Sequence, residues 1–399
     1  MVGPYFPKDE GTDPAKRGAM SLRVAFYSHN GFGLGHVRRN LVLAQALLRR
    51  RPNADVLVIT GSAGLHSFPI PDGMDYVKLP SVRKQATGRW RPHALDIEME
   101  HLLGLRRTII LEAVRAYRPH LFVADYLPLG VEGELQPALE ELSRRADART
   151  AIGFRDILDE PAAVREAWEL EGVPEALEKL YDLVLVYGEP GWFDFAGYGL
   201  DPDLATYVGL LGDPGAAARS RPPGEVRLLA TSGGGADGYP VLAAVLDSLE
   251  QVRPRPGGTV GCTVLTGPLM SEPDVDRLRA TGKRVGARVH RFADDLPWKL
   301  SRASAVVSMA GYNTVCDVLS YRRPAVVIPR PGPSKEQPIR ARILAERGLA
   351  TAVPLSECTG RRMGEAIEAA LTGDPYPDRS LPELGGVDRA TQALLDLTT

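Results

Sequence analysis

This sequence of 399 residues has few cysteines, few aromatic residues and almost no net charge. It contains three cysteines, 7% aromatic residues and a formal net charge of -2. The cysteines lie far apart and show no CxxC or Cys/His spacing, so nothing in the pattern indicates a disulfide framework or a zinc site. A nearly neutral chain has no bulk attraction to nucleic acid. We therefore expect reduced thiols, no zinc site built on cysteines and no nucleic-acid partner.

Long hydrophobic runs are also missing. No apolar stretch approaches the roughly 18 to 20 residues that a membrane-spanning helix needs. Residues 1–20 combine Pro, Gly, Lys and Asp and lack the apolar core of a secretion signal. We predict a disordered leader over 1–20, ordered structure from about Leu22, and a cytoplasmic protein. The content of 44% hydrophobic and 25% charged residues is that of a globular chain.

What the sequence does contain is an alternation of short β-branched runs with longer amphipathic stretches, the pattern of βα units around a parallel sheet. A first series of predicted strands comprises RVAFY (23–27), DVLVI (55–59), LFVAD (121–125), TAIGF (150–154) and LVLVY (183–187). A second series comprises VRLLAT (226–231), TVGCTVLT (259–266), ARVHRF (287–292), ASAVVS (303–308) and PAVVIP (324–329). Apolar residues at helical spacing separate some of these strands, as at 37–51 and 102–117.

The chain is longer than one hydrophobic core usually organises, which favours two domains. GDPGAAARSRPPG, at 212–224, is rich in Pro, Gly and Ala and is the predicted linker. We predict an N-terminal domain over 21–211, a C-terminal domain over 225–375, and a tail over 376–399 whose helix could pack back on the first domain. Both are predicted to be doubly wound α/β domains. Such sheets bind ligands at the carboxyl ends of their strands, so we expect an active site that spans both halves.

A glycine-rich loop follows the first strand and opens the first helix. SHNGFGLGHVRRN (28–40) places Gly33 and Gly35 before His36. Glycines allow close backbone approach, and a helix N-terminus attracts anions, so a phosphate could bind here, although the spacing is not G-x-G-x-x-G. His36 titrates near neutrality and is a candidate general base. The alternative is that His36 only caps the helix. His29 is predicted to be structural.

The second domain repeats this arrangement. Ser232, Gly233, Gly234 and Gly235 follow its first strand, and such a nest can approach a pyrophosphate, although a plain β-turn is the alternative. Later in the chain a strand ends at Ser308, and a helix begins in a turn whose amides can bind phosphate. That turn consists of Gly311, Tyr312, Asn313 and Thr314.

Three further polar side chains follow in the second domain. Asp317, one turn into the helix, could accept hydrogen bonds from ribose hydroxyls; the alternative is a solvated carboxylate. Glu336 and Gln337 begin another helix beyond the next strand end, where they could bind sugar hydroxyls. Such a pair is also common at an ordinary helix start.

These motifs resemble GT-B glycosyltransferases related to the GlcNAc transferase that makes peptidoglycan lipid intermediate II. The resemblance rests on GLGHVRR near the start, SMAGYNTVCDVL in the second domain and EQPIRA after it, and it covers most of 22–375. It implies two Rossmann-like domains that face each other across a cleft, with an acceptor side in the first domain and a nucleotide-sugar side in the second. It also implies a UDP-sugar as co-substrate, with no metal and no other cofactor.

The resemblance also implies roles for residues. Pyrophosphate contacts fall to Ser232–Gly235 and Gly311–Thr314, ribose binding to Asp317, donor-sugar contacts to Glu336 and Gln337, and uracil contacts to the backbone at Phe292 and Ala293. The related enzymes usually have Glu where Asp317 stands. Here Phe32, Arg38 and Arg39 suggest a different acceptor or pyrophosphate contact, so the lipid substrate is not carried over.

The mechanism that the resemblance implies is a metal-independent displacement with inversion at the anomeric carbon. His36 accepts the proton of the acceptor, and Asp125, at another strand end, could orient that base or replace it. Asp294 and Asp295 resemble a metal-binding pair, but in the related enzymes this segment binds the nucleotide base. The sugar is expected to be GlcNAc or another hexose, and the acceptor a small molecule or a lipid-linked one.

Two other functions fit parts of the pattern. A UDP-sugar hydrolase would use His36 to activate water, and a non-catalytic nucleotide-sugar-binding protein would not need His36. An epimerase of related fold would need acidic catalytic residues that we do not find. The helix predicted around 99–119 has an apolar stripe with arginines and could touch an anionic membrane peripherally, or pack on its own sheet. The oligomeric state is not predicted.

Overall fold

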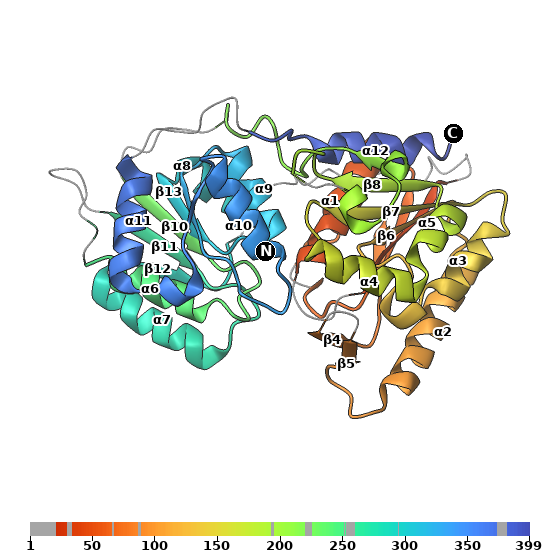
Figure 1. Ribbon diagram of the computed structural model, residues 1–399, viewed down its shortest axis with the longest axis horizontal. Coiled ribbons are helices and arrows are strands. Elements are labelled where there is room, and N and C mark those ends of the chain that lie inside the picture. The colour runs from red at the N-terminus through yellow and green to blue at the C-terminus, as the bar shows by residue number, and fades with distance from the viewer. Residues whose placement is uncertain are drawn as a thin grey trace. The chain divides into compact units, whose positions relative to one another are not determined.

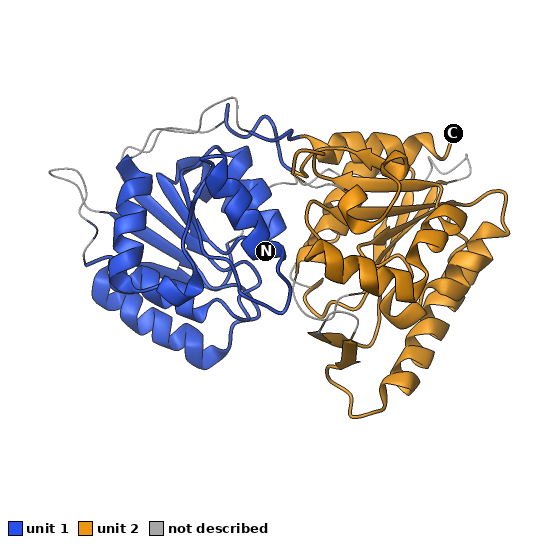
Figure 2. Ribbon diagram, in the orientation of Figure 1, with its two compact units in different colours: residues 1–7, 212–384 blue, residues 8–211, 385–399 orange. Residues whose placement is uncertain are grey.

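The computed structural model describes residues 21–29, 34–65, 68–86, 89–192, 195–219, 226–250, 252, 260–293, 295–372 and 381–399. They fall into two compact units, which Figure 2 colours separately. Among the described residues, the N-terminal unit comprises those up to 211 together with 385–399, and the C-terminal unit comprises those from 212 to 384. Gly33 and Asp294 lie outside the described residues.

The N-terminal unit is built on a parallel sheet with the strand order β3-β2-β1-β6-β7-β8-β9. The strands are β1 (Arg23–Ser28), β2 (Asp55–Thr60), β3 (Met74–Lys78), β6 (Leu121–Asp125), β7 (Arg149–Arg155), β8 (Leu183–Tyr187) and β9 (Ala205–Tyr207). Every residue of β6 is buried, as expected for a central parallel strand that is covered on both faces. The five strands predicted in this half are confirmed.

Helices and one hairpin surround this sheet (Figure 1). The helices are α1 (Gly35–Arg50), α2 (Met99–Tyr117), α3 (Gln136–Ser143), α4 (Pro161–Glu171), α5 (Val173–Leu180) and α12 (Gly386–Asp396), and the hairpin is β4 (Val82–Ala86) with β5 (Arg89–Pro92). The last helix, α12, packs on α1, where Arg50 lies 3.3 Å from Asp388. The chain therefore ends on the N-terminal unit.

The C-terminal unit has a second parallel sheet, in the order β12-β11-β10-β13-β14-β15. Its strands are β10 (Arg227–Thr231), β11 (Gly261–Leu265), β12 (Arg288–His290), β13 (Ala305–Ser308), β14 (Ala325–Val327) and β15 (Thr351–Ala352). Its helices are α6 (Tyr239–Ser248), α7 (Glu272–Val285), α8 (Leu296–Arg302), α9 (Tyr312–Ser320), α10 (Glu336–Glu346) and α11 (Gly360–Thr372). The five strands predicted in this half are present.

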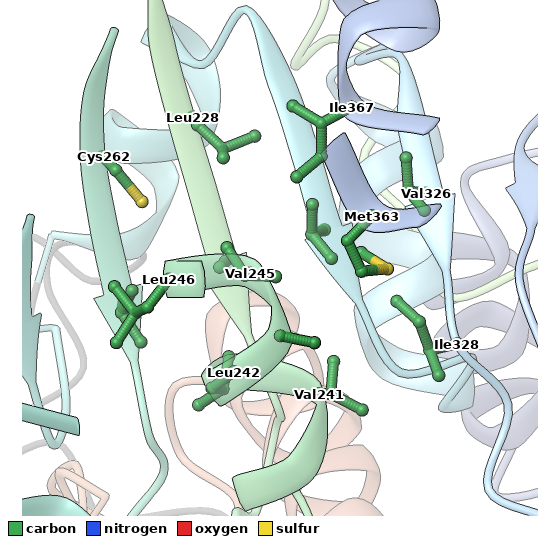
Figure 3. Packing of buried hydrophobic residues seen from close by; sticks show 14 of the residues in the cluster. Leu228, Val241, Leu242, Val245, Leu246, Cys262, Val326, Ile328, Met363 and Ile367 are labelled. Carbon is green, nitrogen blue, oxygen red and sulfur yellow. The ribbon is translucent and has the colours of Figure 1, made fainter. Parts of the chain in front are cut away.

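Successive side chains along β10 point to opposite faces of the sheet, so this strand contributes to a separate apolar cluster on each face. Leu228 belongs to the cluster that α6 and α11 cover, with Val245 and Ile367 (Figure 3), whereas Leu229 belongs to the cluster that contains Val318. Burying a side chain of this size contributes roughly 1.5–3 kcal/mol. The helices are therefore held to the sheet by the apolar residues that the strands present on each face.

The segment 212–224, predicted to be a linker, is partly packed. Residues 214–219 form turns, Ala216 is buried in the core with Val318, and the Asp213 amide donates to Ser320 Oγ at 2.8 Å. Residues 220–225 lie outside the described residues. The described part of this segment therefore belongs to the C-terminal unit.

The apolar stripe of α2 faces the protein. Leu102, Ile110 and Val114 are buried, and so is Arg106, which forms an ion pair with Glu134. None of the helices within the described ranges is both long enough and apolar enough to cross a membrane. Most of the stripe predicted at 99–119 is therefore used for packing.

Each sheet has one point where the chain reverses its winding direction. In the N-terminal unit that point lies between β1 and β6, with Ser28 and Asp125 in register. In the C-terminal unit it lies between β10 and β13, with Thr231 and Ser308 in register. Crevices at these switch points are where doubly wound sheets bind ligands. The predicted catalytic residues follow β1 and end β6, and the two predicted phosphate-binding segments follow β10 and β13.

Candidate active site

His36 and Asp125 meet at the switch point of the N-terminal unit. His36 lies in the first turn of α1, Asp125 is the last residue of β6, and His36 Nδ1 lies 2.5 Å from Asp125 Oδ2. The N-terminal cap of α1 is Leu34, with no side-chain hydrogen bond, so His36 does not cap the helix. A carboxylate accepts only, so it draws the imidazole proton to Nδ1 and leaves a lone pair on Nε2.

Arg39 completes this cluster from the next turn of α1. Its Nε and Nη2 atoms donate to both oxygens of Asp125 at 2.9–3.1 Å. Nη2 also lies 2.7 Å from His36 Nδ1, but it does not donate to that atom while Asp125 holds the Nδ1 proton. Arg39 is only 2% exposed. We predicted a contact between Arg39 and an acceptor or phosphate, but its guanidinium is buried against Asp125. Arg39 therefore holds the carboxylate in place.

The burial of this cluster sets its protonation. Burial lowers the pKa of His36 below its usual value; Asp125 opposes this effect and the charge of Arg39 adds to it. Burial disfavours the charged form of Asp125, but Arg39 and His36 outweigh it and bring the pKa of Asp125 below its usual value. The pair at neutral pH is thus a neutral imidazole on an ionised carboxylate. Of the two predicted roles of Asp125, this geometry favours orienting His36 over replacing it.

Two aromatic side chains pack on His36, and a third packs on one of them. The His29 ring lies 4.8 Å from the His36 ring, and Tyr126 lies 5.3 Å from it. Trp90 of β5 packs on His29 at 5.2 Å. Burial lowers the pKa of His29 well below its usual value, and the charge of His36 adds to this. Both imidazoles are therefore neutral in a largely dry environment, which strengthens the hydrogen bond to Asp125.

A buried ion pair supports the loops that carry these residues. Arg106 of α2 and Glu134, in the loop after β6, are both fully buried and bonded through two nitrogens and two oxygens. Arg106 Nη2 also donates to the His29 carbonyl at 3.3 Å, and Tyr27 of β1 donates to Glu134. This network fixes the end of β1 relative to the loop after β6.

The glycine loop of the C-terminal unit is closely packed. Gly233 and Gly235 have positive φ angles of 66° and 95°. A Cβ on Gly235 would lie 2.1 Å from the Thr266 carbonyl oxygen, and Ser232 Oγ donates to the same oxygen at 2.8 Å. Only glycine fits this path without strain. The loop therefore presents backbone in place of side chains at the end of β10.

The turn before α9 lies next to this loop. A Cβ on Gly233 would lie 3.7 Å from Thr314 Oγ1. Gly311 is the N-terminal cap of α9, and Tyr312 is buried, whereas Asn313, Thr314 and Asp317 are half-buried. The sheet thus brings together the two predicted phosphate-binding segments, at the N-terminus of a helix that favours anions.

Glu336 and Gln337 lie at the start of α10 and are both buried. The Arg330 amide donates to Gln337 Oε1 at 3.0 Å, and Arg330 Nη1 lies 3.2 Å from Asp237, in the turn after the glycine loop. The loops after β10 and β14 are therefore linked by an ion pair, which places the predicted donor-sugar residues at the same sheet edge.

Arg340 is a feature that the sequence did not suggest. It is fully buried, donates to the Ala310 carbonyl at 2.7 Å, and lies over the Tyr312 ring at 5.8 Å. Its Nη2 lies 3.5 Å from Glu336 Oε2. Arg340 thus connects α10 to the turn before α9. Its position four residues after Glu336, one turn along a helix, is the feature of the sequence that could have indicated this contact.

The remaining predicted residues that the structure describes lie on α1 or in the segment after β12. Phe292 and Ala293 are half-buried after β12, Gly35 is the first residue of α1, and Arg38 is half-buried on α1. Within the described ranges, no group of three or more His, Cys, Asp or Glu side chains has a geometry that could hold a metal ion.

Comparison with known proteins shows that the C-terminal unit resembles one family of domains. Residues 234–381 match the model of the glycosyltransferase family 28 C-terminal domain. A UDP-N-acetylglucosamine–N-acetylmuramyl-(pentapeptide) pyrophosphoryl-undecaprenol N-acetylglucosamine transferase from Rhodopseudomonas palustris strain HaA2 is 32% identical over 44% of this chain and 50% of its own length. The transferase of the same name from Bradyrhizobium sp. strain BTAi1 is 28% identical over 80% of this chain and 89% of its own length. The chain spans about half the length of the first curated relatives that it matches.

Solved structures extend the similarity to both units. The MurG structure from Acinetobacter baumannii has a TM-score of 0.58 at 13% identity, over 94% of this chain and 99% of its own. The structure of UDP-glucose: anthocyanidin 3-O-glucosyltransferase in complex with UDP has a TM-score of 0.58 at 14% identity. The match covers 95% of this chain and 93% of that protein. Identities this low show the fold alone. Residues 234–381 are therefore similar to the family 28 C-terminal domain, in a chain that has the GT-B fold and sequence similarity to the peptidoglycan GlcNAc transferases.

Proposed function

We propose that this chain is an inverting glycosyltransferase that moves a sugar, GlcNAc or another hexose, from a UDP-sugar to a hydroxyl group of its acceptor. The observation that carries the proposal is the buried contact between His36 and Asp125 at the switch point of the N-terminal sheet. The family of the C-terminal unit supports the donor half of the proposal. The curated relatives are named as transferases that use UDP-N-acetylglucosamine.

The proposed reaction is a single displacement. The acceptor oxygen attacks the anomeric carbon, the bond from that carbon to the UDP oxygen breaks, and its electron pair leaves with UDP. The acceptor proton passes to Nε2 of His36, while Asp125 holds Nδ1 and stabilises the imidazolium that forms. Attack from the side opposite the leaving group inverts the configuration.

In the donor half of the reaction, charge develops on the leaving diphosphate. Backbone amides of Gly233–Gly235 and the N-terminus of α9 are oriented groups that can neutralise this charge without reorganising. Asp317 binds the ribose hydroxyls, and Glu336 and Gln337 bind the sugar. The proposed reaction needs no metal ion, so we expect UDP release to persist in EDTA.

The decisive experiment measures UDP release from a panel of UDP-sugars, with and without candidate acceptors, for the wild type and His36→Gln. We expect His36→Gln to lower kcat by roughly 10²- to 10⁴-fold, the usual contribution of a general base, while UDP affinity stays the same. His101→Gln is the control, because His101 is exposed on α2. Equal rates in wild type and His36→Gln would remove the catalytic proposal.

A separate measurement tests the donor site. UDP should raise the melting temperature of the wild type more than GDP does, and Asp317→Ala should reduce that shift. If UDP gives no stabilisation, or if Asp317→Ala leaves the shift intact, the proposed donor site is wrong even if His36 proves essential.

We propose the cytoplasm as the place of action, with peripheral contact to an anionic membrane through exposed apolar side chains near the start of α2. Leu95, Ile97 and Leu105 are between 41% and 48% exposed. Sedimentation with vesicles of phosphatidylglycerol tests this contact. Binding of the wild type that Leu95→Ser and Ile97→Ser together abolish is the expected result, and the absence of wild-type binding contradicts it.

A further inference from the structure

An arginine joins two loops at the carboxyl edge of the second sheet. Arg330 follows β14, Asp237 follows the glycine loop after β10, and Arg330 Nη1 lies 3.2 Å from Asp237 Oδ2. Within the sheet, β13 lies between β10 and β14. Neighbouring strands are about 4.8 Å apart, so these two loops leave the sheet roughly 10 Å from each other. The ion pair therefore crosses the carboxyl end of β13, where the chain turns into α9.

The start of α9 has room for a ligand beside this ion pair. Gly311 is the N-terminal cap of α9, and a Cβ placed on it would meet no atom within 4 Å. The first turn of α9 contains no acidic residue. A helix N-terminus offers backbone amides and the positive end of the helix dipole, which favour an anion. An anion bound at this turn would lie between the loops that Arg330 and Asp237 connect.

Two hydrogen-bond donors at this edge have no partner in the part of the chain that the structure describes. One is Nε of Arg330, which is a buried atom. The other is Oγ of Ser308, the fully buried last residue of β13. Buried donors nearly always have a partner, so donors without one are a sign that a bound group supplies it. A phosphate group accepts several hydrogen bonds and carries the charge that a guanidinium neutralises.

Other arginines close to this edge are already engaged. Arg340 is fully buried and donates to a backbone carbonyl. Arg291 donates to two backbone carbonyls at 3.1 Å each and lies 2.7 Å from Glu272. The pair of Arg330 with Asp237 is more exposed, with 30% and 42% of the two side chains accessible. An ion pair with that exposure contributes little stability, so a ligand of higher negative charge can displace Asp237.

We propose that Arg330 binds the diphosphate of the donor and gives up its ion pair with Asp237 to do so. Asp237 is then a competitor of the ligand for the same guanidinium and keeps Arg330 over the end of β13 while the site is empty. This inference rests on the proposed donor site, and it adds a side chain and an exchange of partners to a site that otherwise consists of backbone amides. The charge of Arg330 also opposes the charge that develops on the leaving UDP.

The first test compares UDP with uridine, which lacks both phosphates. Each is titrated into the full chain by calorimetry, for the wild type, Arg330→Gln and Arg330→Lys. We expect Arg330→Gln to weaken UDP binding by roughly 10- to 100-fold, the usual effect of losing a hydrogen bond to a charged group, and to leave uridine binding unchanged. Arg330→Lys keeps the charge and should restore part of the UDP affinity.

The second test uses Asp237→Asn, which removes the competing carboxylate. UDP should bind this variant more tightly than the wild type, by roughly two- to fivefold, because an exposed ion pair no longer has to break. Removal of a contact that only stabilises the fold would not increase affinity. In the Arg330→Gln background, Asp237→Asn should give no such gain, and a gain that persists in full there would overturn the exchange of partners.

The control is Arg342→Gln, at an exposed position further along α10, which should bind UDP like the wild type. Urea unfolding checks that all variants are folded. Unchanged UDP affinity in Arg330→Gln, or an equal loss of UDP and uridine affinity, would overturn this inference and leave the donor site in place. A wild type that does not bind UDP would instead remove the donor site itself, so the two failures give different results.

Discussion

At the scale of single residues, the proposed proton transfer to His36 depends on one carboxylate. Asp125 contacts both His36 and Arg39 and is 1% exposed. It does two things that no neutral side chain does: it stabilises the imidazolium that forms when His36 takes a proton, and it compensates the buried charge of Arg39. A variant that loses the contact of Asp125 with His36 and a variant that loses its contact with Arg39 should therefore differ in their measurable effects.

Asp125→Asn tests the orientation of the base. The amide keeps the size of the side chain but cannot stabilise the imidazolium, so we expect kcat for UDP release to fall by roughly 10²- to 10⁴-fold with little change in KM. Steady-state kinetics measures both constants. Asp147→Asn, at an exposed ion pair with Arg145, is the control that should behave like the wild type. A drop confined to KM contradicts the proposed role.

Arg39 variants test the electrostatics of the pair. His36 must be neutral to act, so the rate falls as pH drops through its pKa, which lies below 6.5. The charge of Arg39 helps to lower that pKa, so Arg39→Gln should move the acidic limb of the rate profile to higher pH. Arg39→Lys keeps the charge and should leave the limb close to its wild-type position. A limb that stays in place in Arg39→Gln would show that Arg39 does not act on His36.

At the scale of elements, the loops of the C-terminal unit depend on backbone shape. Gly235→Ala introduces a Cβ 2.1 Å from the Thr266 carbonyl oxygen at a φ of 95°. We expect it to destabilise this unit by about 1–3 kcal/mol and to abolish UDP binding. Urea unfolding and calorimetric titration measure the two effects.

The matched variant is Gly311→Ala. Gly311 has a φ of -72°, and a Cβ there would meet nothing within 4 Å. It should therefore unfold like the wild type while binding UDP more weakly, because the new methyl group occupies space that a phosphate needs. If both variants retain UDP affinity, the nucleotide binds elsewhere.

At the scale of the whole molecule, the end of the chain stabilises a unit that begins more than 300 residues earlier in the sequence. Leu394 of α12 is fully buried, and α12 packs on α1. Leu394→Ala should cost about 2–5 kcal/mol of unfolding free energy, the usual effect of a core cavity. Leu170→Ala, at a position that is 84% exposed, should change it by less than about 0.5 kcal/mol. Calorimetry of the full chain compares the two, and equal effects would contradict this account of α12.

Local pattern was enough to predict much of the fold. Buried parallel strands such as LFVAD (121–125) are continuous apolar runs, and the loops after them carry glycines and polar residues that are visible in the sequence. The pattern did not predict the strands β3, β9 and β15, because these are edge strands or very short ones. The strand β3 has a single buried residue, so its apolar signal in the sequence is weak.

The sequence by itself determined that the chain forms two α/β halves, each with a glycine loop and a helix N-terminus suited to phosphate, since these features follow from short-range periodicity and glycine geometry. Only the tertiary structure decided that β6 lies beside β1, which brings Asp125 to His36 across 89 positions and turns Arg39 inward. The physical reason is that strand neighbours are chosen by the burial of whole faces, which depends on every element of the sheet and not on the residues next to the site.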